Sequence, residues 1–164
     1  MRIFLCSLFL LLSSPTFAND IITGRAFVID GDTIIIHNTR IRIWGIDAPE
    51  SKQLCIDNKG QNYRCGQKAS FALADWLDKS QPIQCNVQYK DRYKRFVAKC
   101  VRADNRDLGD YMVSNGQALD WPRYSQGYYS NAQEKAKQKK SGMWAGSFLE
   151  PWQWRWNKKS NKIN

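Results

Sequence analysis

VIDGDTIII, residues 28–36, sets two aspartates around a glycine between two runs of β-branched residues. Asp30 and Gly31 predict a tight hairpin turn at this place, because glycine accepts the positive φ that such turns require. The turn needs only the first of the two acids. Asp32, which we expect to open the following strand, is therefore free for another role.

The hairpin belongs to a longer pattern of short strands and helices. Apolar residues alternate or run continuously through residues 21–29, 33–36 and 41–46, which predicts a three-stranded meander, and residues 82–101 supply two more strands. Three helices are predicted, over residues 65–79, 107–118 and 130–144. We therefore expect an α+β fold that is mostly β: a five-stranded OB-fold barrel with about three helices.

The helices show their buried faces and their ends in the sequence. The first carries apolar residues at helical spacing, at Ala69, Leu73, Trp76 and Leu77. Glycines are expected to end the other two, Gly116 the second and Gly142 the third.

The N-terminal segment has the layout of a secretory signal peptide. One arginine precedes an apolar run, and small residues follow, which predicts a signal peptide over residues 1–18 with cleavage after Ala18. A retained N-terminal anchor is the alternative. The mature chain then divides into an OB-fold domain at residues 19–146 and a basic, tryptophan-rich tail at residues 147–164. We expect an exported protein of the periplasm or the extracellular medium, without stable membrane insertion after cleavage.

Removal of the leader leaves four cysteines, an even number that in an exported chain favours two disulfides over free thiols. If residues 84–101 form a hairpin that turns near Arg92 and Tyr93, Cys85 and Cys100 face each other across the two strands. Cys55 then pairs with Cys65. A zinc site is the competing use of four cysteines, but CxxC pairs are missing from the sequence and the spacing does not suit zinc.

The basic residues are concentrated towards the C-terminus. The formal net charge is +10, and from residue 131 onward eight Lys or Arg stand against two acids. Such a surface attracts polyanions, chiefly nucleic acid and secondarily anionic lipid or glycan. Three of the seven tryptophans lie in the stretch PWQWRW. One hypothesis is that they form a stacking platform for bases. The hypothesis we favour is that Trp152 and Trp154 pack the tail onto the barrel.

The second hairpin brings acids together. If it turns at Asn38 and Thr39, Asp32 faces Gly45, and Asp32 and Asp47 meet at one end of the ribbon. Two such carboxylates repel each other unless a cation lies between them, and oxygen ligands without nearby Cys or His suit Ca²⁺ or Mg²⁺.

Three further side chains could complete a phosphodiesterase. Glu50 follows the strand and could orient or deprotonate a water, while Arg42 and Arg95 could clamp a phosphate. The alternatives are that Asp32 is an ordinary acid at a strand edge, and that Arg42 and Glu50 form a surface salt bridge. Because Arg42 and Asp47 are an odd number of residues apart, regular pleating would send them to opposite faces, so we predict a bulge near Gly45.

The only histidine, His37, lies at the far end of this hairpin from the acids. A surface polar role is expected for it. Histidine-pair ribonuclease chemistry, phosphohistidine chemistry and a ββα-metal mechanism are therefore excluded.

Taken together, the motifs VIDGDT, RIRIWGIDAPE, DRYKR, SNGQALDW and SGMWAG resemble the staphylococcal nuclease family in order and spacing, over residues 22–144. The resemblance implies a Ca²⁺-dependent phosphodiesterase, with Mg²⁺ or Mn²⁺ as alternatives. It would cut DNA and RNA, preferably single-stranded or frayed, with little sequence preference, leaving 3′-phosphates. We expect a monomer.

The resemblance also assigns roles by position. Asp32, Asp47 and the carbonyl of Ala48 match metal ligands, Glu50 matches the residue that activates or positions water, and Arg42 and Arg95 match the phosphate-binding arginines. Arg92 and Tyr93 match residues near the terminal phosphate, and Tyr124 matches a tyrosine that stacks on the base. Lys94 stands where a glycine is common in the family. The rival hypothesis from another class is an exported nucleic-acid-binding OB-fold protein without catalytic activity.

Overall fold

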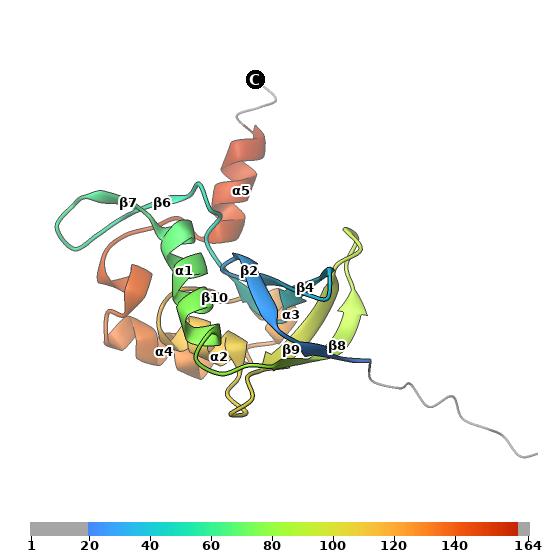
Figure 1. Ribbon diagram of the computed structural model, residues 1–164. Coiled ribbons are helices and arrows are strands. Elements are labelled where there is room, and N and C mark those ends of the chain that lie inside the picture. Colours follow the sequence, from blue (N-terminus) through green and yellow to red (C-terminus); the bar gives the residue numbers. More distant parts are fainter. Residues whose placement is uncertain (1–19, 161–164) are drawn as a thin grey trace, which may run out of the picture.

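The computed structural model describes residues 20–160, and a curled six-stranded sheet forms its centre (Figure 1). In spatial order its strands are β1 (Ile21–Gly24), β8 (Ile83–Lys90), β9 (Phe96–Val101), β4 (Thr39–Ile43), β3 (Thr33–Ile36) and β2 (Ala26–Asp30). Only Arg25 separates β1 from β2, so one chain segment supplies both edges of the sheet and requires it to curl. The α+β class is confirmed, with an OB-like sheet in which the predicted first strand, residues 21–29, is divided in two.

Four very short strands form two ladders outside the main sheet. They are β5 (Ile46–Asp47) with β10 (Leu119–Asp120), and β6 (Leu54–Ile56) with β7 (Asn62–Arg64). None was predicted, because two or three residues carry no readable alternation. The β5–β10 ladder pairs Asp47 with Leu119, and so fixes the backbone of a candidate metal ligand.

The described residues contain five α-helices and one 3₁₀ helix, where about three helices were predicted. They are α1 (Cys65–Leu77), α2 (Leu108–Ser114), α3 (Pro122–Ser125), α4 (Ser130–Gln138), η1 (Gly142–Ala145) and α5 (Pro151–Ser160). The predicted third helix was too long, since α4 ends at Gln138 and Gly142 begins η1 instead of capping α4. The predicted tail contains α5, which extends from the body of the protein in Figure 1.

Helix α1 closes one side of the core, and it packs against β2 (Figure 1). Its four predicted core residues are all buried, at Ala69, Leu73, Trp76 and Leu77. Position 31 requires glycine because Ala48 and Ala69 leave no room for a side chain, and not because of the positive φ that was predicted. A Cβ atom at position 31 would lie 2.7 Å from the Cβ of Ala48 and 3.0 Å from that of Ala69.

The second hairpin turns one residue earlier than predicted. His37 and Asn38 both have positive φ, of 48° and 62°, so they form the central residues of the turn. Thr33 therefore pairs with Arg42, and the predicted pairing is wrong by two positions. A shift of two keeps every side chain on the same face, and Asp32 stays at the end of the ribbon near Ile43. His37 lies at the surface, with its ring nitrogen 3.1 Å from the carbonyl oxygen of Thr23.

A turn takes the place of the predicted bulge near Gly45. Strand β4 ends at Ile43, and the chain turns through Trp44 and Gly45, which has a φ of 74°, before β5 begins in another ladder. Arg42 and Asp47 therefore lie on different strands, and the alternation of side chains along one strand no longer requires them to point to opposite faces. Register shifts occur instead in β2 and in β8, away from this turn.

Two disulfides join the pairs predicted from the sequence. Cys85 and Cys100 are directly opposed in the β8–β9 ladder and buried in the main core. Cys55 and Cys65 join β6 to the start of α1 in a second, smaller core. Disulfides favour an oxidising compartment. The predicted signal peptide, residues 1–18, lies outside the described residues, and across residues 20–160 the helices are too short or too polar to cross a membrane.

Replacing Cys85 and Cys100 together by alanine should lower the free energy of unfolding by about 3 kcal/mol, because the cross-link closes a loop with a sequence separation of 15. Urea unfolding followed by fluorescence measures the change. Wild-type protein unfolded in dithiothreitol, which opens both disulfides, should lose more stability than the Cys85→Ala/Cys100→Ala variant does. Equal stability of the paired variant and the oxidised wild type would contradict this assignment.

Candidate active site

Arg42 lies between the two aspartates predicted to bind metal. Its Nη1 donates to Oδ1 of Asp32 at 3.1 Å, and its Nη2 lies 2.8 Å from Oδ2 of Asp32 and 2.8 Å from Oδ1 of Asp47. The side chains of Asp32 and Asp47 are 6% and 0% exposed. Two buried carboxylates thus face the same guanidinium nitrogen, and the structure brings these predicted site residues together.

The electrostatics of the site show an excess of negative charge. Burial raises the pKa of Asp47, and the nearby Asp32 raises it further against the lowering effects of two guanidinium groups. Burial, followed by the charge of Asp32, raises the pKa of Asp30 to about 6. Burial by itself would lower the pKa of Arg42, but the charges of Asp32 and Asp47 outweigh it and raise that pKa. Burial thus opposes the charges of Asp30 and Asp47, and the guanidinium groups offset part of this effect at Asp47.

Arg155, on α5, is the site residue that the sequence analysis missed. Its Nη1 donates to Oδ1 of Asp47 at 3.0 Å, and its Nη2 donates to Oδ2 of the same carboxylate at 2.6 Å. The same Nη1 also donates to Oε1 of Glu50 at 2.9 Å. Burial opposes its charge, yet the hydrogen bonds and charges of Asp47 and Glu50 raise the pKa of Arg155. Arg155 thereby links Glu50 to the buried pair of aspartates.

Aromatic packing brings Arg155 into the site. The ring of Trp152 stacks on that of Trp121, with centroids 6.1 Å apart and planes 10° from parallel. The guanidinium carbons of Arg42 and Arg155 lie 5.4 and 5.6 Å from the ring centroid of Trp121. The packing interpretation of the tail is therefore confirmed for Trp152. The pattern Trp-Arg-Trp in the tail was the available signal, but only its tryptophans were considered.

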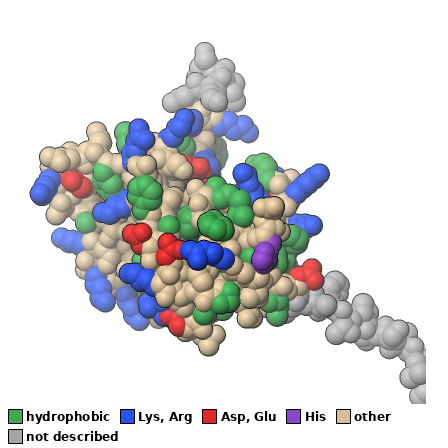
Figure 2. Space-filling view, viewed as in Figure 1, with side chains coloured by type: hydrophobic (Ala, Val, Ile, Leu, Met, Phe, Trp, Pro, Cys, Tyr) green, Lys and Arg blue, Asp and Glu red, His purple; other side chains and the backbone are tan. Residues whose placement is uncertain are grey.

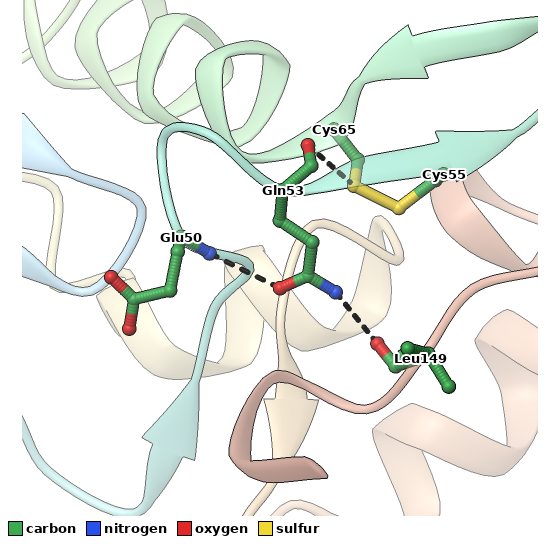
Figure 3. The surroundings of a disulfide bond; sticks show 5 residues. All are labelled: Glu50, Gln53, Cys55, Cys65 and Leu149. Carbon is green, nitrogen blue, oxygen red and sulfur yellow. Dashed lines mark hydrogen bonds between the residues drawn. A yellow bond between two sulfur atoms is a disulfide. The ribbon is translucent and has the colours of Figure 1, made fainter. Parts of the chain in front are cut away.

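Gln53 ties the Glu50 loop to the segment that leads into α5 (Figure 3). This fully buried side chain accepts a hydrogen bond from the backbone N–H of Glu50 at 3.3 Å and donates one to the carbonyl of Leu149 at 2.7 Å. Figure 3 also shows the Cys55–Cys65 disulfide beside Gln53. The backbone of Glu50 is held close to α1 as well, since a Cβ at Gly66 would lie 1.9 Å from the carbonyl oxygen of Glu50.

The other side of the site is the loop between β8 and β9. Arg95 uses Nε and Nη2 to contact Oδ2 of Asp91, each at 2.8 Å. These bonds, with backbone N–H donors of Tyr93 and Arg95, lower the pKa of Asp91 against the opposing effect of its burial. Lys94 adopts a φ of 64°, the left-handed conformation that a glycine adopts more easily.

Arg92 and Tyr93 lie at the tip of this loop. The Tyr93 side chain is 65% exposed, and the guanidinium carbons of Arg92 and Arg95 lie 4.9 and 5.5 Å from its ring centroid. The structure thus gathers Arg92, Tyr93 and Arg95 on the loop. Among the described residues, their side chains do not contact the three site acids Asp32, Asp47 and Glu50.

Register relates the loop to the acids. Strands β4 and β9 are parallel neighbours in which Arg42 pairs with Val97. Arg95 lies in the loop two residues before Val97, directly before β9 begins at Phe96. One predicted phosphate-binding arginine therefore lies on β4 and the other at the end of the loop that leads into its neighbour β9.

Tyr124 packs against Trp121, the ring that also lies near Arg42 and Arg155. It is 40% exposed, and its ring meets the ring of Trp121 edge-on, with centroids 4.4 Å apart. Tyr89, a residue the sequence analysis did not select, lies close enough to Tyr124, Arg42 and Asp91 for their charges to affect its pKa, which burial raises.

The predicted ligands are of the type that a hard divalent cation prefers. Asp32 and Asp47 offer carboxylate oxygens that converge on a point now held by Arg42, and neither imidazole nor thiolate competes there. Glu50 is turned towards Arg155, so the three acids are linked through guanidinium groups. Over residues 20–160, three or more acidic, His or Cys side chains do not come together closely enough to hold a metal. The roles of Asp32, Asp47 and the Ala48 carbonyl as ligands stay predictions.

Replacing Arg155 by alanine should lower the free energy of unfolding by about 2 kcal/mol, because the buried Asp47 loses a partner that binds both its oxygens. Arg155→Lys keeps the charge and should recover part of the loss. Urea unfolding measures both. The matched control is Arg25→Ala, which removes an exposed pair with Asp78 and should change stability by less than about 0.5 kcal/mol. Equal effects of Arg155→Ala and Arg25→Ala would refute the role given to Arg155.

Comparison with known proteins identifies the family. The family described as "Staphylococcal nuclease homologue" matches residues 40–146. A "Succinoglycan biosynthesis protein ExoI" of Rhizobium meliloti is 41% identical over 135 residues, which cover 82% of this chain and 71% of the relative. An "Uncharacterized endonuclease" of Haemophilus influenzae is 33% identical over 141 residues, covering 82% and 72%. Another of Escherichia coli O157:H7 is 28% identical over 164 residues, covering 96% and 100%. This chain belongs to the staphylococcal nuclease family.

Proposed function

We propose that this protein is an exported, Ca²⁺-dependent endonuclease that hydrolyses phosphodiester bonds of DNA and RNA and leaves 3′-phosphates. The observation that carries the proposal is the position of Arg42, fixed between two buried carboxylates, one of which is linked through Arg155 to the more exposed Glu50. Family membership and relatives named endonucleases support it. The two disulfides support export to the periplasm or the medium.

The chain's own side chains have distinct tasks in this proposal. Arg42 from β4 and Arg95 from the loop that leads into β9 bind oxygens of the scissile phosphate, and their charge stabilises the additional charge at phosphorus during attack. Asp32, Asp47 and the Ala48 carbonyl would hold Ca²⁺. When bound, this ion supplies positive charge that weakens the repulsion between the phosphate and its nucleophile.

Glu50 is the group nearest to solvent among the acids, with 39% of its side chain exposed. It accepts a proton from the attacking water or orients that water. The water oxygen bonds to phosphorus, the bond to the 5′ oxygen breaks, and the leaving oxygen gains a proton from solvent. Arg155 and Gln53 are positioning residues, since one holds the carboxylate of Glu50 and the other its backbone.

Loose specificity follows from the kinds of contact available. Guanidinium groups bind phosphate, which carries no information about base sequence. Tyr93 and Tyr124 offer exposed rings near these groups, Tyr93 towards a terminal phosphate and Tyr124 towards a base. Stacking on such rings is open to every base and requires unpaired nucleotides, so we propose a preference for single-stranded or frayed substrate.

The test is incubation of purified mature protein with plasmid DNA and with RNA across Ca²⁺, Mg²⁺ and Mn²⁺, each with an EDTA control. The proposal predicts shortening of both polymers that EDTA stops, and oligonucleotide products heavier by a 3′-phosphate in mass spectrometry. Glu50→Gln and Arg95→Ala should each lower kcat by about 10²-fold or more, while Arg25→Ala leaves it unchanged.

Each result separates this proposal from its rival. A nucleic-acid-binding protein without catalysis would retain DNA in a filter or gel assay yet leave its length unchanged in every metal. That outcome, or full activity in EDTA, would overturn the proposal. Circular dichroism of the Glu50→Gln and Arg95→Ala variants shows that lost activity does not come from unfolding.

A further inference from the structure

An open cavity lies between the candidate catalytic glutamate and α5. It has a volume of about 280 Å³ and is lined by Glu50, Trp154, Arg155, Lys158 and Lys159. Four of these five residues belong to α5, which lies beyond the part of the chain matched by the family, residues 40–146. The cavity is therefore formed mainly by a helix outside the matched residues.

The cavity wall carries cations that the active site does not use. Helix α5 holds three cations, Arg155, Lys158 and Lys159, and no acid. Arg155 is engaged with Asp47 and Glu50 and anchors the helix. Lys158 and Lys159 are exposed, and neither enters an ion pair with a residue in the described part of the chain. Lys158 Nζ lies 4.8 Å from the ring centroid of Trp154, so this lysine and the ring line the same side of the opening to Glu50, with Lys159 beside them.

We propose that this cavity is an additional subsite for single-stranded nucleic acid. Lys158 and Lys159 bind backbone phosphates of the strand as it continues away from the bond that is cut, and Trp154 supplies a wall on which a base rests. The inference depends on the proposed function, because the strand enters the cavity from the phosphate held near Glu50.

Position and charge favour a nucleic acid over an anionic membrane. Glu50 belongs to the cavity wall, so an occupant must come close to the candidate catalytic site. The cavity is open along its length, and a flexible single strand can follow its surface as far as Glu50. In Figure 2 a group of Lys and Arg side chains surrounds the upper part of the molecule, where Figure 1 places α5, and a second group lies at the lower left near α4. The second group supplies a matched control.

The experiment compares Lys158→Ala/Lys159→Ala with wild-type full-length mature protein. Anisotropy of a labelled decathymidylate in EDTA measures binding without cleavage, at several salt concentrations. The paired variant should raise Kd about tenfold and reduce the slope of log K against log salt by about 1.4, because each phosphate contact on a single strand contributes about 0.7. A thymidine dinucleotide, which the proposal places at Arg42 and Arg95, should bind equally to the variant and to wild type.

Lys135→Ala/Lys139→Ala, which removes one exposed charge from α4 and one from the residue that follows it, is the control and should leave the Kd of both ligands within about twofold. The subsite is refuted if both paired variants bind decathymidylate alike, or if wild type does not bind it. It is also refuted if the Lys158 and Lys159 changes abolish sedimentation with phosphatidylglycerol vesicles but leave oligonucleotide binding intact. Plasmid cleavage by the Lys158/Lys159 variant tests the nuclease function separately, since a failed subsite leaves that cleavage in place.

Discussion

The buried carboxylate of Asp47 is the constraint on which the rest of the site depends. A carboxylate with no exposed surface has a high desolvation cost, and it persists only with strong partners. Here Arg42 and Arg155 supply them from a strand and from a helix far away in the sequence. The same pairing holds Glu50 at the rim, so one buried charge organises the acids and both guanidinium groups.

This constraint also explains the architecture around the site. Strand β4 carries Arg42, the loop that leads into the neighbouring β9 carries Arg95, and the short β5–β10 ladder fixes the backbone of Asp47. Trp121 lies against both arginines that contact Asp47, and Trp152 extends the stack into α5. Helix α5 is thus part of the site, although it lies outside residues 40–146, which match the family.

The sequence predicted what depends on local pattern. Alternation placed Asp32 and Asp47 at one end of the hairpin even though the turn was one residue off, because a two-position register shift preserves faces and ends. Opposed strands likewise predicted Cys85 with Cys100. Arg155 was not predictable in this way, since it reaches Glu50 across 105 positions through the packing of tryptophans, and pattern rules do not describe such contacts. The same holds for the turn that replaces the expected bulge, where pairing with β10 decides the path.

The most direct test of the central claim is a crystal structure of the mature protein with Ca²⁺ and a phosphorothioate-linked single strand that resists cleavage. The account predicts one phosphate in contact with Arg42 and Arg95, with Glu50 facing its phosphorus and Ca²⁺ on Asp32 and Asp47. A strand bound on another face of the molecule, with these five side chains untouched, would contradict it.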